Sequence, residues 1–451
     1  MLIHLHTYGC QMNQYDSELV KSLLSTADPE WTSDPEQADV ILVNTCCVRD
    51  HAEQRALGRL RQLVHLKKFR PWVRVGILGC IAQARKGELF DQIPGLDWVI
   101  GPDGYRELPQ LLAGSGSAPG VLHSDAGESY DDVIPTQLAG PTAFVAVMRG
   151  CDNYCSYCVV PQVRGRERSR PLASIVKEAE GLSSAGVREI TLLGQNVNSY
   201  RDGDHDFSDV LRRVGAVSGI ERVRFTTSHP KDLSTRLVQV MSEVPQVCPC
   251  LHLPAQSGSD RILHLMNRQY TRSRYLEKIA MVRKYVPHVA ITTDILVGFP
   301  TETDQDFQAT MGLLEEVRFH GVFSFRYSVR AGTTAAAMPD DVPESVKIAR
   351  LETVIERQRA ITRELHDARV GDSELILVEA PAKKGDGHLM GRTPHDEVVV
   401  FPGNGANIGD FCEVKIMEVR GFTLAGELLH IRESNSLQRV SSPSSHLRCC
   451  M

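Results

Sequence analysis

Three closely spaced cysteines carry the clearest chemical signal in the sequence. Cys151, Cys155 and Cys158 form a Cys-x3-Cys-x2-Cys motif after an apolar, strand-like run. A structural zinc site normally has four protein ligands, and no fourth Cys or His lies at a suitable spacing here. Three thiolates suit instead a cubane [4Fe-4S] cluster in which one iron has no protein ligand. A zinc site completed by a distant histidine, or a redox-active cysteine pair, is the alternative. We call these three cysteines the radical triad.

An iron without a protein ligand is useful only if another molecule binds it. The amino and carboxylate groups of S-adenosylmethionine can chelate such an iron, which brings the sulfonium close enough for one-electron cleavage to a deoxyadenosyl radical. The motif therefore predicts radical chemistry that depends on S-adenosylmethionine. Tyr157, inside the motif, is a candidate contact for this cofactor.

Three other cysteines are far apart in the sequence, but each stands at the same kind of place, just after a predicted strand. Cys10, Cys46 and Cys80 each stand at the exit of a β-rich run. Any one of them alone would more often be a packing residue, because free cysteine is common in cores. The carboxyl ends of parallel strands lie at one edge of a sheet, however, so these thiols can meet there. We predict that this auxiliary triad holds a second [4Fe-4S] cluster with its own open iron, and that all six cysteines are metal ligands and catalytic. Cys47 could compete, but Cys46 directly follows the apolar run.

Hydrophobic periodicity predicts the elements that must position these thiols. Residues 1–117 alternate short strands and helices, which is typical of a doubly wound parallel sheet, and residues 118–136 have the composition of a linker. Residues 137–369 hold six further β-α repeats, enough for a partial (β/α)6 barrel with its reactive groups at the carboxyl ends of the strands. Residues 370–434 hold five short strands, which suggests a small closed β-barrel, and we expect the Ser-rich residues 435–451 to be disordered. The expected fold class is therefore α/β with a C-terminal all-β barrel.

The predicted strands and helices have the following bounds. In the N-terminal region the strands cover residues 2–8, 39–45, 73–79 and 97–100, and the helices 17–27 and 52–69. The strands of the partial barrel cover residues 144–149, 190–194, 223–227, 251–254, 289–297 and 322–329.

Composition excludes several classes of protein. The chain has 451 residues, with 50 Lys and Arg against 56 Asp and Glu, and 42% of its residues are hydrophobic. This composition is that of a globular protein and not of a disordered or collagen-like chain. No run approaches the ~18 consecutive apolar residues of a membrane helix, and the N-terminus is unlike a signal peptide. We expect a cytoplasmic protein with no membrane partner, in which cysteines serve metals and not disulfides.

Longer motifs around these cysteines resemble a known family. They are TYGCQMN at 7–13, NTC at 44–46, RGRERSRP at 164–171, LGQNVNSY at 193–200, TSHP at 227–230, QSGS at 256–259 and DILVGFPTE at 294–302. The chain resembles the methylthiotransferases of the radical S-adenosylmethionine superfamily over nearly its whole length, and within them the branch that acts on isopentenyladenosine in tRNA. The resemblance implies an N-terminal methylthiotransferase domain, a radical core and a C-terminal barrel of the TRAM type.

The resemblance also implies a reaction. Its substrate is adenosine 37 of tRNA that already carries an isopentenyl group on N6, and its product carries a methylthio group on carbon 2. An ordinary base cannot remove the hydrogen on that carbon, so a radical is required. Two S-adenosylmethionine molecules are implied, one to methylate sulfur attached to the auxiliary cluster and one to be cleaved reductively at the radical cluster. The implied partners are this tRNA, a reducing electron donor such as flavodoxin or ferredoxin, and a sulfur donor.

Polar residues at the predicted strand ends of the barrel are candidates for holding S-adenosylmethionine or the base. Their position favours a ligand role, although such residues also cap helices in β-α turns. They are Gln195, Asn196, Ser228, His229, Gln256, Ser257, Asp294 and Arg326. His229 precedes Pro230 and could simply fix a turn.

Two basic stretches stand out in a chain of net charge -6. Residues 54–87 contain nine Lys and Arg and no Asp or Glu. Residues 164–170 contain four arginines. A charged run is usually a solvated helix face, but we interpret both as surfaces for tRNA phosphates beside the cysteine motifs. The C-terminal barrel is acidic overall, so we expect it to contact RNA through few residues and through shape.

Two alternatives remain at the level of the sequence. A sister methylthiotransferase would share both clusters but would act on threonylcarbamoyl-adenosine in tRNA or on an aspartate of a ribosomal protein. The motifs at 7–13 and 164–171 resemble the isopentenyl branch more closely. A non-enzymatic iron–sulfur protein for RNA binding or electron transfer would not need an open iron at both clusters.

Overall fold

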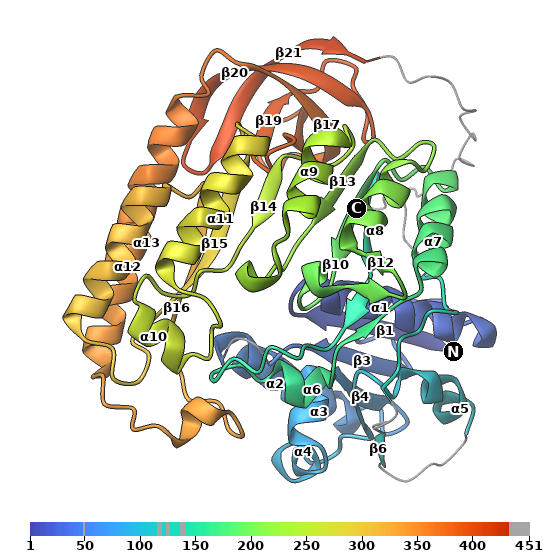
Figure 1. Ribbon diagram of the computed structural model, residues 1–451. Coiled ribbons are helices and arrows are strands. Elements are labelled where there is room, and N and C mark those ends of the chain that lie inside the picture. The colour runs from blue at the N-terminus through green and yellow to red at the C-terminus, as the bar shows by residue number, and fades with distance from the viewer. Residues whose placement is uncertain (48–49, 115–119, 123–126, 136–139, 433–451) are drawn as a thin grey trace. The chain divides into compact units, whose positions relative to one another are not determined.

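The computed structural model describes residues 1–47, 50–114, 120–122, 127–135 and 140–432 (Figure 1). The chain divides into two compact units, Met1–Leu365 and His366–Met451. The finer domain boundaries that we derive from the sequence stay a prediction. Among the described residues, no helix combines the length and the apolar character needed to cross a lipid bilayer.

A six-stranded parallel sheet forms the N-terminal part of the first unit, in the order β2-β1-β3-β4-β5-β6. Strand β3 is buried along its whole length, as expected for a parallel sheet with both faces covered. Helices α2 and α3 pack with Ile41 and Val43 on one face, and α1 and α5 pack with Leu42 on the other. The strands are β1 (Leu2–Tyr8), β2 (Glu30–Trp31), β3 (Val40–Thr45), β4 (Arg74–Gly79), β5 (Trp98–Ile100) and β6 (Gly120–Leu122). The helices are α1 (Gln11–Leu24), α2 (Asp50–His65), α3 (Cys80–Arg85), α4 (Glu88–Gln92) and α5 (Leu108–Ala113).

Six parallel strands form the partial barrel in the rest of this unit. They pair as β7-β10-β13 and β14-β15-β16, and a parallel bridge between Val223 and Val247 connects the two sheets. The strands are β7 (Thr142–Ala146), β10 (Glu189–Leu193), β13 (Arg222–Phe225), β14 (Cys250–His252), β15 (Ala290–Val297) and β16 (Gly321–Arg326). Two short hairpins accompany them, β8 (Met148–Arg149) with β9 (Arg168–Ser169) and β11 (Arg201–Asp202) with β12 (His205–Asp206).

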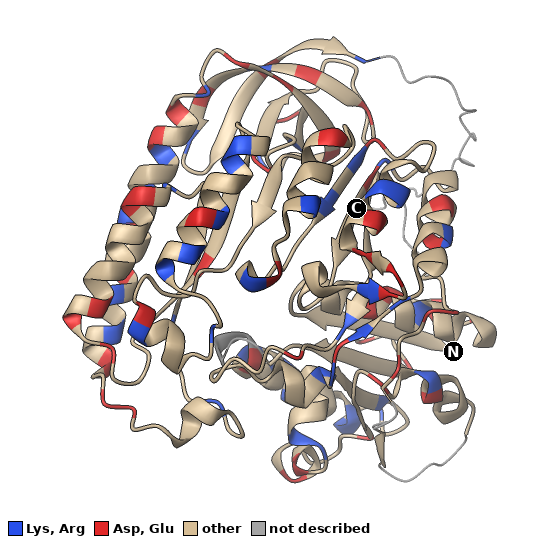
Figure 2. Ribbon diagram, in the orientation of Figure 1, with Lys and Arg blue, Asp and Glu red and all other residues tan. Residues whose placement is uncertain are grey.

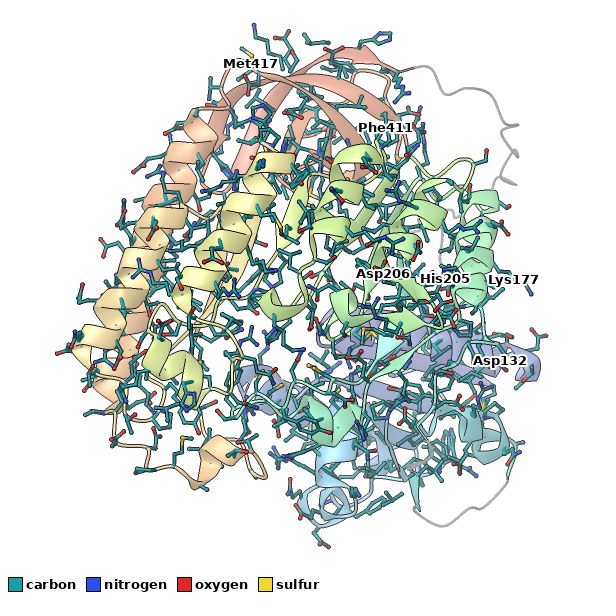
Figure 3. All side chains as sticks on the ribbon, viewed as in Figure 1. Asp132, Lys177, His205, Asp206, Phe411 and Met417 are labelled. Atoms are coloured by element: carbon teal, nitrogen blue, oxygen red, sulfur yellow. The ribbon has the colours of Figure 1, made fainter. Side chains whose placement is uncertain are left out.

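Helices cover the outside of the partial barrel, and several begin at a side-chain cap. Asp206, labelled in Figure 3, accepts from the backbone N–H of Ser208, and Thr303 opens another helix in the same manner. These caps satisfy N–H groups that the first helical turn leaves without partners. The helices are α6 (Val160–Arg164), α7 (Leu172–Ser184), α8 (Phe207–Gly215), α9 (Thr235–Glu243), α10 (Asp260–Leu265), α11 (Arg272–Tyr285), α12 (Asp304–Val317) and α13 (Glu344–Asp367).

The second unit is a closed five-stranded barrel in the order β17-β18-β19-β21-β20. Alternation along its strands separates core from surface: on one strand Val414 and Ile416 are buried, whereas Met417, labelled in Figure 3, is half exposed. Cys412 lies in the core of this barrel. The strands are β17 (Ser373–Pro381), β18 (His388–Arg392), β19 (Val398–Pro402), β20 (Phe411–Arg420) and β21 (Thr423–Ile431). The predicted α/β class, with its partial barrel and its closed C-terminal barrel, is confirmed.

Two local features differ from the sequence-based expectation. Helix α1 begins at Gln11 and not at residue 17, because Cys10 has the extended backbone of an N-cap and the helix follows it at once. The segment that we predict as a linker contributes strand β6, which pairs with β5. Tyr130 in the same segment is buried, and its hydroxyl donates to the carbonyl of Pro102 at 2.9 Å. Short strands and single buried aromatic residues carry too little periodicity to be recognised in a Gly- and Pro-rich stretch.

Candidate active site

The cysteines of the auxiliary triad follow three neighbouring strands that end in register. Tyr8 of β1 pairs with Thr45 of β3, and Thr45 pairs with Gly79 of β4. Cys46 and Cys80 are the next residues after their strands, and Cys10 follows β1 by two residues. The sheet therefore places all three thiols at one edge, as predicted from the strand exits.

Small and polar residues hold this edge in shape. A side chain at Gly9, whose φ is +155°, would meet Cys46 Cβ at 2.8 Å, so the chain can approach this closely only without one. The buried Asn13 amide donates to Asn44 Oδ1 at 3.1 Å and to the carbonyl of Thr45 at 3.0 Å, and Asn44 donates to the carbonyl of Asn13 at 2.9 Å. These reciprocal bonds tie the start of α1 to the end of β3, so the backbone next to Cys10 and Cys46 is fixed.

The thiols of this edge interact in two pairs. The hydrogen bond with Cys46 is the main reason that the pKa of Cys10 is lowered, to about 6, and a hydrogen bond with Cys47 lowers the pKa of Cys80. Cys47 itself is buried in the core together with Cys80, and its pKa is raised chiefly by that hydrogen bond. The structure thus brings four thiols together where we assign three ligands, and the choice of Cys46 over Cys47 stays a prediction.

The radical triad lies on a loop that follows β8. Gly150 begins this loop with φ at +77°, and a side chain there would collide with the carbonyl of Arg166. The backbone N–H of Cys151 donates to Gly165 at 3.2 Å, and that of Cys158 donates to Cys155 at 3.0 Å. These bonds fold the motif into a compact turn that carries its three thiols.

One buried arginine contacts the radical triad directly. Arg268 is 5% exposed, and its Nη1 donates to Cys155 Sγ at 3.3 Å while its Nη2 donates to the carbonyl of Pro254 at 2.9 Å. Its Nε donates to the hydroxyl of Tyr270 at 3.0 Å. A cation in this position stabilises the thiolate form that an iron ligand requires. Burial acts in the opposite direction and raises the pKa of Cys151, and that of Cys158 to about 12.

A buried ion network connects the loops of the two triads. The carboxylate of Asp16 on α1, fully buried, accepts from Arg149 and from Arg164, each at 2.8 Å. Arg149 stands two residues before Cys151, and Arg164 ends helix α6. A second fully buried pair, Arg170 with Glu178 at 2.6 Å, lies beside it and includes the hydroxyl of Tyr15. The sheet with the auxiliary triad and the loop with the radical triad are therefore joined through desolvated charges.

Two of the predicted strand-end residues contact the loop of the radical triad or the residues beside it, and Ser228 precedes one of them in the chain. Gln195 accepts from the backbone N–H of Gly150 at 2.6 Å. The ring of His229 lies edge-on to the ring of Tyr270, which bonds to Arg268. His229 Nε2 and the hydroxyl of Ser228 are buried without a hydrogen-bond partner. Unpartnered buried polar atoms at the carboxyl edge of a barrel are what a polar ligand would satisfy.

The other predicted strand-end residues make internal contacts. Asn196 accepts from the backbone N–H of His229 at 3.0 Å, and Ser257 lies 3.3 Å from the hydroxyl of Thr310. Gln256 continues the parallel pairing with Ile295 by a single bridge. Asp294 pairs with His252 at 3.5 Å, and Arg326 forms an exposed ion pair with Glu344 at 2.8 Å. Tyr157 packs against a buried cluster that includes Leu296. The cofactor-binding role of all these residues stays a prediction.

Three residues close to the triads are absent from the sequence-based prediction. Asp16, Arg149 and Arg268 all lie outside the strand-end positions that we select. Asp16 and Arg268 each come from a helix or from the loop after one, where a single charged residue has no recognisable spacing. A buried charged residue can be recognised only when its interaction partner is known, and in each case that partner lies far away in the sequence.

The basic stretch at residues 164–170 has a different role from the one we expect. Arg164 and Arg170 are buried in ion pairs, Arg168 pairs with Asp103 at 3.1 Å, and only Arg166 is largely exposed. The interpretation as a tRNA surface is therefore wrong for most of this stretch. Buried guanidinium groups with carboxylate partners serve the packing between elements.

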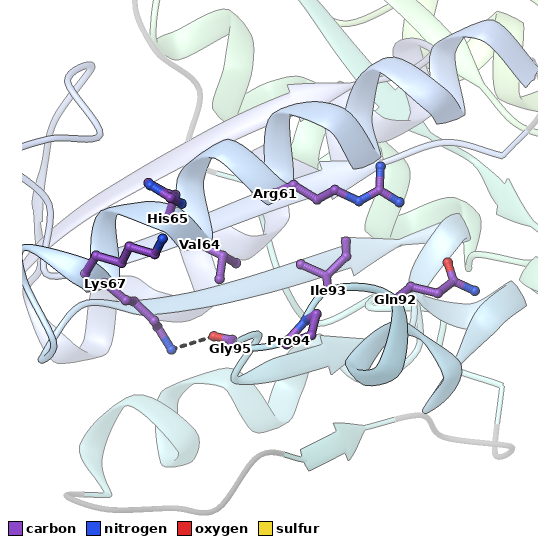
Figure 4. A pocket seen from close by; sticks show the side chains of 9 residues that line it. Arg61, Val64, His65, Lys67, Gln92, Ile93, Pro94 and Gly95 are labelled. Atoms are coloured by element: carbon purple, nitrogen blue, oxygen red, sulfur yellow. Dashed lines mark hydrogen bonds between the residues drawn. The ribbon is translucent and has the colours of Figure 1, made fainter.

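The longer basic stretch also lies differently from the expectation. Residues 66–73 precede strand β4, so they stand at the amino edge of the sheet, opposite the cysteines. Lys67 donates to the carbonyl of Gly95 at 2.6 Å beside an open pocket of about 450 Å³ (Figure 4). The residues that line this pocket are Arg61, Val64, His65, Lys67, Lys68, Gln92, Ile93, Pro94 and Gly95. Elsewhere basic and acidic residues are interspersed, as along α13 (Figure 2).

The donor atoms of both triads are cysteine sulfur atoms. Within the part of the chain that the structure describes, no three His, Cys, Asp or Glu side chains are gathered closely enough to ligate one metal ion. In a cubane each thiolate binds a different iron. The six cysteines of the two triads form no disulfide, and cysteine thiolates are the usual ligands of such clusters.

Comparison with known proteins assigns the three regions of the chain to families. Residues 145–314 match the radical SAM superfamily, residues 2–101 match the protein family UPF0004, and residues 367–429 match the TRAM domain.

Relatives of known name match the chain over almost its whole length. The tRNA-2-methylthio-N(6)-dimethylallyladenosine synthase of Chloroherpeton thalassium is 47% identical over 432 residues, which cover 95% of this chain and 96% of that protein. The enzymes of the same name from Chlorobaculum tepidum and Bacteroides thetaiotaomicron are 47% and 43% identical, over 94% of this chain. The chain belongs to this synthase family. The family predicted from the sequence motifs is confirmed, and with it the expectation of a radical S-adenosylmethionine enzyme.

Solved structures share the fold of this synthase family at low sequence identity. The radical S-adenosylmethionine methyltransferase TsrM of Kitasatospora setae, solved with cobalamin and a [4Fe-4S] cluster bound, has a TM-score of 0.59 and 13% identity, and the match covers 86% of this chain and 80% of that one. The cobalamin-dependent radical enzyme OxsB has a TM-score of 0.52 and 11% identity over 80% of this chain and 57% of that one.

The protonation of His229 leads to a first prediction. Burial, with a contribution from Arg268, lowers the pKa of His229 from 6.5 to about 2. Below pH 6.5 the unfolded chain binds a proton at this residue that the folded chain does not, so folding stability falls as the pH falls, by up to about 1.4 kcal/mol per pH unit. His229→Asn keeps an acceptor for the backbone N–H of Lys231 and removes the titration. Denaturant unfolding between pH 7 and 5 is expected to show a shallower pH dependence in the variant, and equal slopes would contradict the prediction.

Proposed function

We propose that this protein catalyses methylthiolation of carbon 2 of N6-isopentenyladenosine at position 37 of tRNA, with two S-adenosylmethionine molecules and two [4Fe-4S] clusters. The observation that carries the proposal is the arrangement of the two triads. Three thiols lie at one edge of the parallel sheet, and the loop with the other three is joined to the same part of the molecule through Asp16. Relatives at 43–47% identity with the name of this activity support the same substrate.

The chain supplies ligands, orientation and hydrogen-bond donors for this chemistry. When bound, the two clusters and S-adenosylmethionine supply the radical, the methyl group and the transferred sulfur. Cys151, Cys155 and Cys158 would hold the radical cluster, and Arg268 orients Cys155 through its 3.3 Å contact. Cys10, Cys46 and Cys80 would hold the auxiliary cluster at the end of the sheet. Cys46 and Cys80 are buried, Cys10 is exposed, and the three cysteines of the radical triad are partly exposed.

Polar atoms at the carboxyl edge of the barrel would hold the cofactor or the base. His229 is neutral, and its Nδ1 accepts from the backbone N–H of Lys231, so Nε2 carries the proton and can donate. The hydroxyl of Ser228 is a second free donor next to it. Gln195, which accepts from Gly150, would fix the loop of the radical triad against the end of β10.

The relatives do not support the sister activities. A methylthiotransferase for threonylcarbamoyl-adenosine or for a ribosomal aspartate would share the triads, but the matched relatives are named for the dimethylallyladenosine substrate. The electron donor, which we expect to be flavodoxin or ferredoxin, the sulfur donor and the cytoplasmic location stay predictions. tRNA is the macromolecular partner that the proposed reaction requires.

Nucleoside analysis of tRNA tests the proposed function. In cells that lack this protein and any redundant enzyme, 2-methylthio-N6-isopentenyladenosine is expected to disappear and N6-isopentenyladenosine to accumulate, because the methylthio step comes after isopentenylation. Mass spectrometry of digested tRNA measures both nucleosides. An unchanged level of the methylthio nucleoside would refute the assignment, and loss of a methylthio group from threonylcarbamoyl-adenosine instead would support the sister activity.

A further inference from the structure

The guanidinium of Arg164 pairs with the carboxylate of Asp16 and also interacts electrostatically with thiols of the auxiliary triad. Helix α6, which Arg164 ends, packs on the core that contains Cys80, through Val163. Arg164 is 5% exposed, and its charge interacts with Cys80 and with Cys10. Although it belongs to the loop region of the radical triad in sequence, it stands beside the other triad in space.

Two hydrogen-bond donors in this neighbourhood have no partner. Arg164 Nη2 donates to Asp16 at 2.8 Å, but its Nη1 is buried without a hydrogen bond. The hydroxyl of Tyr105 is also buried without a partner, and Tyr105 interacts electrostatically with Arg164 and with Cys80. A buried donor without an acceptor is destabilising, so two of them that interact electrostatically with Cys80 indicate an acceptor that belongs there.

Arg149, the other arginine that pairs with Asp16, has an aromatic ring beside its unpaired N–H groups. Arg149 also has N–H groups without a hydrogen bond, but its guanidinium lies 4.9 Å from the centre of the Tyr130 ring. The face of an aromatic ring attracts a cation and accounts for part of the lost hydration. For Arg164 the neighbouring groups are Asp16, Tyr105 and the thiols of Cys10 and Cys80.

We propose that Arg164 and Tyr105 are positioning residues for the auxiliary cluster, and that Arg164 Nη1 and the Tyr105 hydroxyl donate hydrogen bonds to its sulfur atoms. Asp16 holds the guanidinium in place through Nη2. Hydrogen bonds to sulfur and a nearby positive charge both stabilise the more negative, reduced state of an iron–sulfur cluster, and so raise its reduction potential. This inference rests on the proposed function, because it requires the auxiliary cluster.

The test measures the auxiliary cluster alone. In full-length protein with Cys151→Ala, Cys155→Ala and Cys158→Ala, only the auxiliary cluster remains, and its midpoint potential is followed by electron paramagnetic resonance. Arg164→Gln and Tyr105→Phe are each expected to lower this potential and to shift the iron–sulfur stretching bands in resonance Raman spectra. Arg164→Lys keeps the charge but loses the planar fork, so its potential is expected to lie between those of the parent and Arg164→Gln.

Matched controls and iron content separate the possible outcomes. Arg166→Gln and Tyr154→Phe change the same residue types at exposed positions and are expected to leave the potential unchanged. If Arg164→Gln and Tyr105→Phe both hold full iron and both have the same midpoint potential as the parent protein, this inference is overturned. The proposed function is then unaffected. If Arg164→Gln fails to fold, Tyr105→Phe decides, because it removes a single oxygen. Absence of the auxiliary cluster from the parent protein would overturn both the inference and the proposed function.

Discussion

Anaerobic reconstitution is expected to load about eight irons on the intact chain and about four on a variant with Cys10→Ala, Cys46→Ala and Cys80→Ala, since each cubane holds four. The physical reason is the register of β1, β3 and β4, which brings these three thiols to one edge of the sheet. The variant is also expected to form no methylthio product, because the auxiliary triad has no substitute elsewhere in the proposed reaction. Iron and sulfide analysis, with product detection by mass spectrometry, measures both effects.

Single substitutions sharpen this experiment. Cys412→Ala, in the core of the C-terminal barrel, is expected to keep about eight irons, because that thiol is a packing residue. Cys47→Ala is also expected to keep them, whereas Cys46→Ala is expected to lose part of the iron. The opposite result for Cys46 and Cys47 would show that the ligand is misassigned. Four irons in the intact chain would contradict the presence of two cubane clusters.

The second large effect is expected from Asp16→Ala. Asp16 is fully buried and accepts from two arginines that are themselves buried, so its removal leaves two desolvated positive charges without a counterion. Breaking a buried ion pair from one side costs about 3–5 kcal/mol. Denaturant unfolding is expected to show a loss of this size in the transition of the first unit. Because Asp16 also fixes Arg149 beside the radical triad, we expect lower product formation even at temperatures where the variant is folded.

Asp152→Ala is the matched control for this prediction. Asp152 also pairs with an arginine, Arg166 at 3.1 Å, but both side chains are exposed. An exposed ion pair contributes about 0–1 kcal/mol, so this variant is expected to unfold almost like the parent protein. Equal destabilisation by Asp16→Ala and Asp152→Ala would contradict the role that we give to the buried network. Asp16→Asn, which keeps an acceptor oxygen but not the charge, is expected to fall between the two.

The strand exits show how far the sequence determines the site. The apolar runs that end before Cys46 and Cys80 predict buried parallel strands, and parallel strands must share a carboxyl edge, so the meeting of the auxiliary thiols follows from sequence alone. The Cys-x3-Cys-x2-Cys spacing likewise needs no tertiary information. Sequence reasoning fails for most of the four arginines at residues 164–170, which it places at a tRNA surface although two of them are buried in ion pairs.

The sequence by itself determined which residues we predict to carry the chemistry: six thiols in two triads, on strand exits and on one loop. The tertiary structure alone decided what surrounds them. Asp16 meets Arg149 and Arg164 across more than 130 residues of chain, and Arg268 reaches Cys155 across 113. The reason is physical. A ligand motif is local and has a recognisable spacing, whereas a buried charge is defined by a distant partner that compensates its desolvation, and only the folded chain shows which partner that is.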